Sequence, residues 1–252
     1  MKWLLILFVS GFATFTIVRK DGFEWKGKNT SIHAYQSFAV LELFTSEGCS
    51  SCPPADLLLP QLAAANPNII PLSFHVDYWD RLGWKDPFSS AEFSQRQQDY
   101  ARQLGVESIY TPQLIINGKL ELVGSNRSTA EADIKKVLNE KAAVTITIDK
   151  VMEKNKRLAV ECTLAGALDQ TVVAAALVQK HAEMSVKAGE NRGAKLSHTN
   201  VVRSFAHKPA KVKMEFEIDV PSDLNSDSWE LILYSQQKKD LQITGVAVWE
   251  KR

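Results

Sequence analysis

The chain has 252 residues, of which 45% are hydrophobic and 23% charged, a balance typical of a folded globular protein and unlike that of a disordered one. Lys and Arg number 30 against 29 for Asp and Glu, so a net charge of +1 gives no electrostatic reason to expect nucleic-acid binding. The length is sufficient for two ordinary domains or one large one.

The first twenty residues are predicted to be an export signal or an N-terminal anchor. Lys2 is followed by an uncharged run from Trp3 to Val18, which Arg19 ends. The nearest match to a cleavage site, Gly11-Phe12-Ala13, is poor, so an uncleaved anchor stays open, although the run is shorter than the ~20 residues of a spanning helix. We therefore expect a protein that is exported, periplasmic or membrane-anchored and facing outward. Residues 21–36 are predicted to be a polar linker.

Cys49 and Cys52 form a CxxC pair between a predicted strand, residues 38–44, and a predicted helix, residues 55–65. At this position the first sulfur lies near unpaired N–H groups and the positive end of the helix dipole, which favour the thiolate that attacks disulfides. We expect Cys49 to be the exposed nucleophile and Cys52 the shielded partner. The alternative, half of a zinc site, needs two further ligands, and the chain has 3 Cys, 5 His and no second CxxC or HxxxH motif.

The segments that follow continue a β-CxxC-α-β order. Residues 69–76 predict a second strand, and residues 77–105 a helical insertion. Thr111-Pro112 then leads into two apolar runs joined by Asn117-Gly118, a strong hairpin signal. Another helix is predicted from Ser128, because Ser128 to Glu131 has capping-box spacing.

From Ala143 the pattern changes to about seven alternating or β-branched segments separated by turn residues, which predicts a small β-sandwich. We place the boundary near Lys141, so that residues 37–141 form one domain and residues 142–252 the next. The long polar loop Lys187 to His198 is a candidate binding or interdomain segment. Alternation places Cys162 on an apolar strand face, where a free cysteine is expected to be buried and unreactive.

The order of these elements is similar to the thioredoxin fold. In thioredoxin-like proteins the pair that matches Thr111-Pro112 holds a cis peptide bond facing the CxxC disulfide, so the resemblance implies a cis bond before Pro112. Three segments, residues 42–56, 75–80 and 189–193, look more narrowly like an exported thioredoxin-like family of unknown function, the DUF1223 type. The resemblance implies an α/β fold, with a thioredoxin-like domain carrying a helical insertion followed by a small all-β sandwich, and it implies no particular substrate.

The resemblance also raises the question of a buried carboxylate that accepts a proton below the CxxC pair. Glu42 is the candidate, but its register is one residue away from the usual position, and such a slip turns a strand side chain to the opposite face. Glu42 is therefore either the proton acceptor or an ordinary paired carboxylate. Thr111 and Trp79 are candidates for contacting the substrate, although packing of the insertion on the domain is the favoured role for Trp79.

We therefore expect an exported thiol–disulfide oxidoreductase that uses no cofactor and acts on protein or small-molecule disulfides, with protein thiols or disulfides, or another redox partner, as its partners. Cys49 attacks, Cys52 resolves the mixed disulfide, and Pro112 shapes the face where the partner docks. One alternative is a copper-handling module in which His75 joins the two thiols as a ligand. The other is a non-catalytic binding protein in which the disulfide is structural and only stabilises the turn.

Overall fold

The computed structural model describes residues 23–24, 30–225 and 227–251. Its helical elements are α1 (Pro53–Ala64), the short 3-10 helix η1 (Asp80–Leu82), α2 (Ala91–Leu104) and α3 (Arg127–Val137). Its strands are β1 (Phe23–Glu24), β2 (Thr30–Ala34), β3 (Ala39–Thr45), β4 (Ile69–His75), β5 (Gln113–Ile116), β6 (Leu120–Val123), β7 (Val144–Lys154), β8 (Arg157–Gly166), β9 (Thr171–Ser185), β10 (Lys195–Pro209), β11 (Lys213–Asp219), β12 (Trp229–Gln237) and β13 (Ile243–Lys251).

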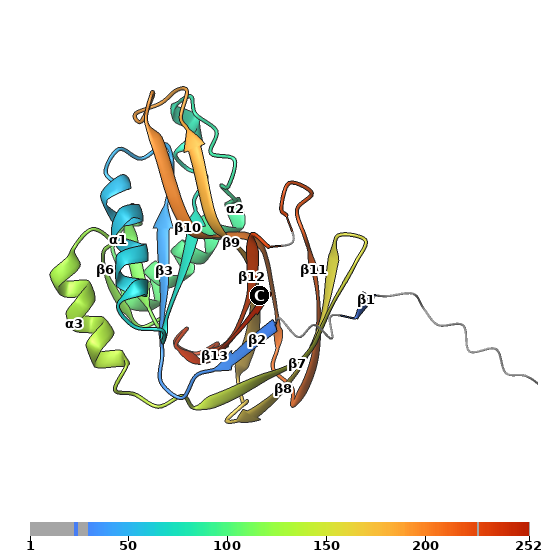
Figure 1. The fold of residues 1–252 in the computed structure, drawn as a ribbon. Coiled ribbons are helices and arrows are strands. Elements are labelled where there is room, and N and C mark those ends of the chain that lie inside the picture. The colour runs from blue at the N-terminus through green and yellow to red at the C-terminus, as the bar shows by residue number, and fades with distance from the viewer. Residues whose placement is uncertain (1–22, 25–29, 226, 252) are drawn as a thin grey trace, which may run out of the picture.

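The described strands form two sheets, which Figure 1 shows side by side. The larger is a mixed sheet of nine strands in the order β2-β13-β12-β9-β10-β4-β3-β5-β6. In it β4 pairs in parallel with both β3 and β10, and the other neighbours pair antiparallel. The smaller sheet has four antiparallel strands in the order β1-β7-β8-β11.

Helices cover both faces of the β4-β3-β5 part of the large sheet (Figure 1). Leu41 and Leu43 of β3 face α1 and α3, where leucines 58, 59 and 62 complete one apolar core. Val40 and Phe44, at the alternate positions of the same strand, face α2 and pack near Tyr100. Because side chains alternate along a strand, this arrangement fixes which β3 residues lie on the side of the CxxC helix.

A third core lies between the small sheet and one face of β9, β12 and β13. Alternate residues of β8, including Val160 and Cys162, point into it, and Trp229 stacks on Trp249 with ring centroids 5.4 Å apart. The second half of the chain therefore does form two packed sheets. One of them, however, is the nine-stranded sheet that also holds β3 and β4.

The predicted fold class, a thioredoxin-like α/β domain with a helical insertion followed by a small all-β sandwich, is wrong. The protein is mostly β, and its large sheet continues without a break from β6 to β2. The link is made where β10 pairs with β4, at Val201 opposite Ser73. Alternation in a sequence predicts that a segment is a strand but does not say which strand it pairs with, so this connection was not visible. Whether the chain divides into two domains near Lys141 stays a prediction.

Several local predictions are confirmed. The CxxC helix, a helix (α2) within the predicted insertion and the hairpin at Asn117-Gly118 are present, and both hairpin residues have positive φ, as the favoured two-residue turn requires. The predicted linker, residues 21–36, instead contains β1 and β2, which pair with β7 and β13.

The predicted export signal or anchor, residues 1–20, lies outside the described residues. Within residues 23–24, 30–225 and 227–251, none of the helices combines the length and the apolar character needed to cross a bilayer.

Candidate functional site

Cys49 and Cys52 form a disulfide at the start of α1, with their Cα atoms 5.5 Å apart. Cys52 is the N-cap residue, and Pro53 and Pro54 occupy the first helical turn, where a missing N–H costs little. The backbone N–H of Cys52 donates to the Cys49 carbonyl, and the N–H of Ala55 donates to the Cys52 carbonyl. The CxxC turn therefore continues directly into the helix.

The Thr111–Pro112 segment faces the disulfide. The predicted cis peptide bond between Thr111 and Pro112 is present. The Thr111 carbonyl oxygen lies 3.7 Å from Cys49 Sγ and accepts a hydrogen bond from the Ser51 hydroxyl at 3.2 Å. The indole N–H of Trp79 donates to Thr111 Oγ1 at 2.8 Å. Four residues singled out from the sequence, Cys49, Thr111, Pro112 and Trp79, thus meet at one place.

Both cysteines are fully buried, so the expectation that Cys49 is exposed is wrong. Ser50 and Ser51, between the two cysteines, are exposed. Ser51 Oγ lies 3.3 Å and the Thr111 carbonyl oxygen 3.7 Å from Cys49 Sγ, and the turn between β9 and β10 contacts the Cys49 backbone, where the Asn191 side-chain amide donates to the Cys49 carbonyl at 2.9 Å. The predicted polar loop is shorter than expected, because β10 begins at Lys195.

Glu42 is an ordinary paired carboxylate on the face of β3 that lies away from the CxxC helix. Its Oε1 accepts from Arg96 Nη2 at 2.8 Å and from the Tyr234 hydroxyl at 3.0 Å, and its Oε2 accepts from the Tyr100 hydroxyl. These partners belong to α2 and β12. The prediction that Glu42 accepts a proton from the CxxC pair is therefore wrong, because the side chain points to the other side of the sheet.

A buried charged cluster lies instead on the α1 side of the sheet, around His198 of β10. The His198 ring is buried between two carboxylates, with Nε2 3.5 Å from Glu47 Oε1 and Nδ1 3.6 Å from Asp56 Oδ1. These are ion-pair distances, slightly longer than ordinary hydrogen bonds. Burial alone lowers the pKa of His198, but the facing carboxylates outweigh it and raise the pKa to about 10. His198 is therefore an imidazolium ion at neutral pH.

A second histidine–carboxylate pair adjoins His198. His75 and Asp86 are both buried and joined by a hydrogen bond of 2.7 Å between Nδ1 and Oδ2, and the His75 ring centroid lies 4.7 Å from that of His198. Asp86 Oδ2 also accepts the backbone N–H of Glu47 at 2.8 Å. Burial raises the pKa of Asp86, but His75 and the donated N–H groups outweigh it and hold the pKa below its ordinary value.

Asp56 connects this cluster to the disulfide. It lies four residues after Cys52 on α1, so the two side chains share one face of the helix. Its Oδ2 accepts a hydrogen bond from the Thr45 hydroxyl at 3.2 Å, while Oδ1 faces His198 and has no hydrogen-bond donor among the described residues. Asp56 was not predicted as a site residue from the sequence, although its spacing of four residues from Cys52 was a usable signal.

His75, proposed as an alternative metal ligand, is directed to Asp86. Among the described residues, no group of three or more His, Cys, Asp or Glu side chains is arranged to hold a metal ion.

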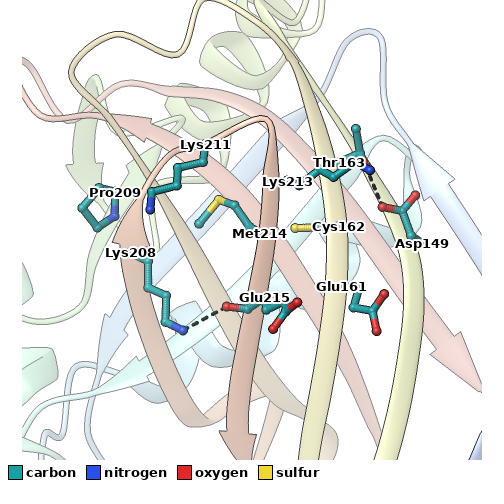
Figure 2. Close-up of a pocket in the computed structure, with 10 residues that line it drawn as sticks. All are labelled: Asp149, Glu161, Cys162, Thr163, Lys208, Pro209, Lys211, Lys213, Met214 and Glu215. Carbon is teal, nitrogen blue, oxygen red and sulfur yellow. Dashed lines mark hydrogen bonds between the residues drawn. The ribbon is translucent and has the colours of Figure 1, made fainter.

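A cavity of about 760 Å³ lies elsewhere, beside β7, β8, β11 and the end of β10 (Figure 2). Its three lysines and three carboxylates balance in charge, and none of the residues around the CxxC turn lines it. Cys162 is among its lining residues but is itself only 1% exposed, which confirms the predicted burial. Burial, with a smaller contribution from Asp149, raises the pKa of Cys162 to about 11. This thiol is a poor nucleophile at neutral pH.

Comparisons with known proteins agree with the fold and leave the activity open. Residues 40–236 match the family model described as "Protein of unknown function (DUF1223)". A crystal structure of protein AGR_C_4864 from Agrobacterium tumefaciens is 25% identical, with a TM-score of 0.64 and coverage of 87% of this chain and 97% of that chain. HBP35 of Porphyromonas gingivalis shares the fold at 12% identity, with a TM-score of 0.59 and coverage of 86% and 76%. No curated protein matches the chain.

Proposed function

The chain belongs to the DUF1223 family, and from that premise we propose that it is a thiol–disulfide oxidoreductase acting on protein disulfides through Cys49 and Cys52. The observation that carries the proposal is the position of the disulfide at the N-terminus of α1, opposite the Thr111 carbonyl. A sulfur at a helix N-terminus is favoured as a thiolate, the reactive form in exchange. We propose that Thr111, Pro112 and Trp79 contact the partner chain, because they border Cys49.

The exchange proceeds in two displacements. The Cys49 thiolate attacks one sulfur of the partner disulfide, forming a mixed disulfide while the other partner sulfur leaves as a thiolate and takes up a proton. The Cys52 thiolate then attacks Cys49 Sγ, the mixed disulfide breaks, and the second partner sulfur leaves and is protonated. Two electrons and two protons pass from the CxxC dithiol to the partner, and the Cys49–Cys52 disulfide forms.

The proton that leaves Cys52 needs an acceptor, and we assign this role to Asp56. It shares a helix face with Cys52, it is buried, and one of its carboxylate oxygens has no hydrogen-bond donor among the described residues. The His198 ring lies beside this free oxygen, with Nδ1 3.6 Å from Asp56 Oδ1.

The test follows mixed-disulfide formation between the reduced protein and a peptide disulfide. Cys49→Ser is expected to abolish the reaction, whereas Cys52→Ser forms mixed disulfides that persist. Asp56→Asn is expected to slow the resolving step by about 10²-fold or more at neutral pH, in the range of a lost general base, and to shift its pH profile upward. Mass spectrometry of acid-quenched samples measures each species.

Cys162→Ser serves as the matched control and is expected to leave all rates unchanged. The proposal also requires a reduction potential above about −300 mV, because structural disulfides lie lower. The proposal is contradicted if the reduction potential is lower than this and either Cys49→Ser keeps full activity or neither the wild type nor the variants react. The disulfide would then only stabilise the turn.

We also propose that the protein works outside the cytoplasm, where a disulfide can persist. The support is Lys2 and the uncharged run from Trp3 to Val18. Fractionation of the native host should recover the protein in an exported or outward-facing membrane fraction. Recovery of intact, unprocessed protein in the cytosol contradicts this assignment.

A further inference from the structure

We propose that the turn between β9 and β10, residues 186–194, is a cap that decides which molecules reach the Cys49–Cys52 disulfide, and that Glu190 and Asn191 make it selective for a polypeptide partner. The inference rests on the proposed function, since it concerns access to the same disulfide. In Figure 1 the β9–β10 hairpin extends past the end of β3 and ends beside the start of α1.

Asn191 and Glu190 attach the cap to the CxxC turn. The Asn191 side-chain amide donates to two backbone carbonyls, that of Cys49 at 2.9 Å and that of Glu47 at 2.8 Å. The Glu190 carboxylate accepts the backbone N–H of Ser50 at 3.1 Å. Through these contacts a segment some 142 residues away in sequence lies directly on the cysteine turn, and Cys49 is 0% exposed.

The cap has a defined shape of its own. Gly189 and Gly193 have φ values of +73° and +85°, a conformation that glycine adopts without strain. The Val186 N–H donates to the Ala194 carbonyl at 2.9 Å, and the Gly193 N–H donates to the Val186 carbonyl at 2.9 Å. Gly189 also packs closely on Trp84, since a Cβ atom at this position would lie 3.2 Å from the Trp84 Cβ.

Among the described residues, three side-chain hydrogen bonds join the cap to the turn beneath it, one from Glu190 and two from Asn191. Glu190 is exposed and its bond to Ser50 lies at the surface, so water replaces this bond at little net cost. The bonds of Asn191 to the Cys49 and Glu47 carbonyls are part-buried and are the ones that opening has to break. In the proposed opening the long β9–β10 ladder stays paired, and the backbone groups of the turn that carries Cys49 become free.

The bonds that the cap makes indicate the class of partner that replaces it. The turn offers an N–H at Ser50 and a carbonyl at Cys49, and the cap satisfies them with one acceptor and one donor. These two groups belong to one peptide unit and point in opposite directions, and an extended polypeptide has backbone N–H and C=O groups that can bond one of them from its side, as in other cases of main-chain recognition. A small dithiol without amide groups lacks this pair. A cysteine-containing polypeptide therefore replaces hydrogen bonds that are lost when the cap is displaced, and a small dithiol does not.

The experiment measures how fast two reductants reduce the disulfide of the oxidised full-length protein. The reductants are dithiothreitol and an extended peptide with two cysteines, compared at equal thiolate concentration by quenching and mass spectrometry. For the Glu190→Gln/Asn191→Ala variant we expect dithiothreitol to react about tenfold faster than with the wild type. The advantage of the peptide over dithiothreitol, present in the wild type, is expected to shrink at least threefold in the variant.

Arg192→Ala, at an exposed position on the same turn, is the matched control and is expected to stay within twofold of the wild type. Glu190→Gln alone, which keeps the side-chain shape, gives a second measurement if the double variant folds poorly. If each reductant reduces the disulfide equally fast in the wild type and in the variants, the proposal that residues 186–194 control access to the disulfide is wrong. If dithiothreitol reacts faster with the variant but the peptide never reduces the wild type faster than dithiothreitol does, the proposal of a polypeptide partner is wrong. Reduction by dithiothreitol does not require that the protein be an oxidoreductase, so a failure of the proposed function would be seen separately, as the lack of peptide-disulfide exchange.

Discussion

Glu42→Gln is expected to lower the free energy of unfolding by about 3–5 kcal/mol, because it leaves a largely buried guanidinium without its counter-charge. Arg96 donates to Glu42 from both Nε and Nη2, at 3.0 and 2.8 Å. The carboxylate is 0% exposed and the Arg96 side chain 15%, so neither charge is well solvated in the folded protein. Chemical denaturation at neutral pH measures the effect.

The environment of Arg96 supports a large effect. Its guanidinium carbon lies 5.0–5.7 Å from the ring centroids of four aromatic residues, namely Phe74, Tyr100, Phe205 and Tyr234. Burial, together with the charge of Glu42, holds the pKa of both tyrosines well above the ordinary value, so they stay neutral donors. Cation–π contacts persist in the variant, but rings do not replace a carboxylate as a hydrogen-bond acceptor.

Two further variants make this prediction specific. Glu131→Gln removes the carboxylate of an exposed pair with Arg127 and is expected to cost no more than about 0.5 kcal/mol. Glu42→Leu combined with Arg96→Met removes both charges and is expected to be less destabilised than Glu42→Gln, because no unpaired charge remains buried. If Glu42→Gln lowers the free energy of unfolding by less than about 1 kcal/mol, water solvates the Arg96 guanidinium in the variant and the prediction is wrong. Disulfide exchange should be retained, since Glu42 lies on the other side of the sheet.

His198→Gln is expected to destabilise the protein most at neutral and lower pH, and progressively less as the pH rises. The pKa of His198 is raised from 6.5 to about 10 in the folded protein, so its stabilising contribution is complete below pH 6.5 and is lost as the pH rises towards 10. At about 1.4 kcal/mol per pKa unit, the contribution is on the order of 5 kcal/mol. The groups that face His198 are Glu47, Asp56 and His75, with Asp86 behind His75.

The measurement is the difference in unfolding free energy between wild type and variant at several pH values from 6.5 to 10. His181→Gln is the matched control, because this histidine is 61% exposed and 3.8 Å from Glu183. The effect of His181→Gln on the unfolding free energy is expected to be small, because exposed ion pairs contribute little to stability. A difference for His198→Gln that is constant between pH 6.5 and 10 would mean that His198 does not lose its charge in this range.

Some of the site was predictable because it depends on near neighbours in the chain. The CxxC pair, the prolines after it and the Asn117-Gly118 hairpin all follow from residues a few positions apart, whereas the cis bond at Pro112 was implied by the family resemblance. Burial of Cys162 followed from alternation along a single strand. These features are decided by backbone geometry and local propensity, which a sequence displays directly.

The tertiary structure decided everything that depends on which strands become neighbours. Pairing of β10 with β4 joins the two predicted domains in one sheet and brings His198 over Asp56. The long β9–β10 ladder likewise brings Asn191 to the Cys49 carbonyl. Alternation in β3 was visible in the sequence, but only the placement of α1 and α2 on opposite faces showed that Glu42 points to Arg96. Burial and charge pairing depend on contacts between residues far apart in the chain, and a one-residue shift in strand register reverses them without changing any local pattern.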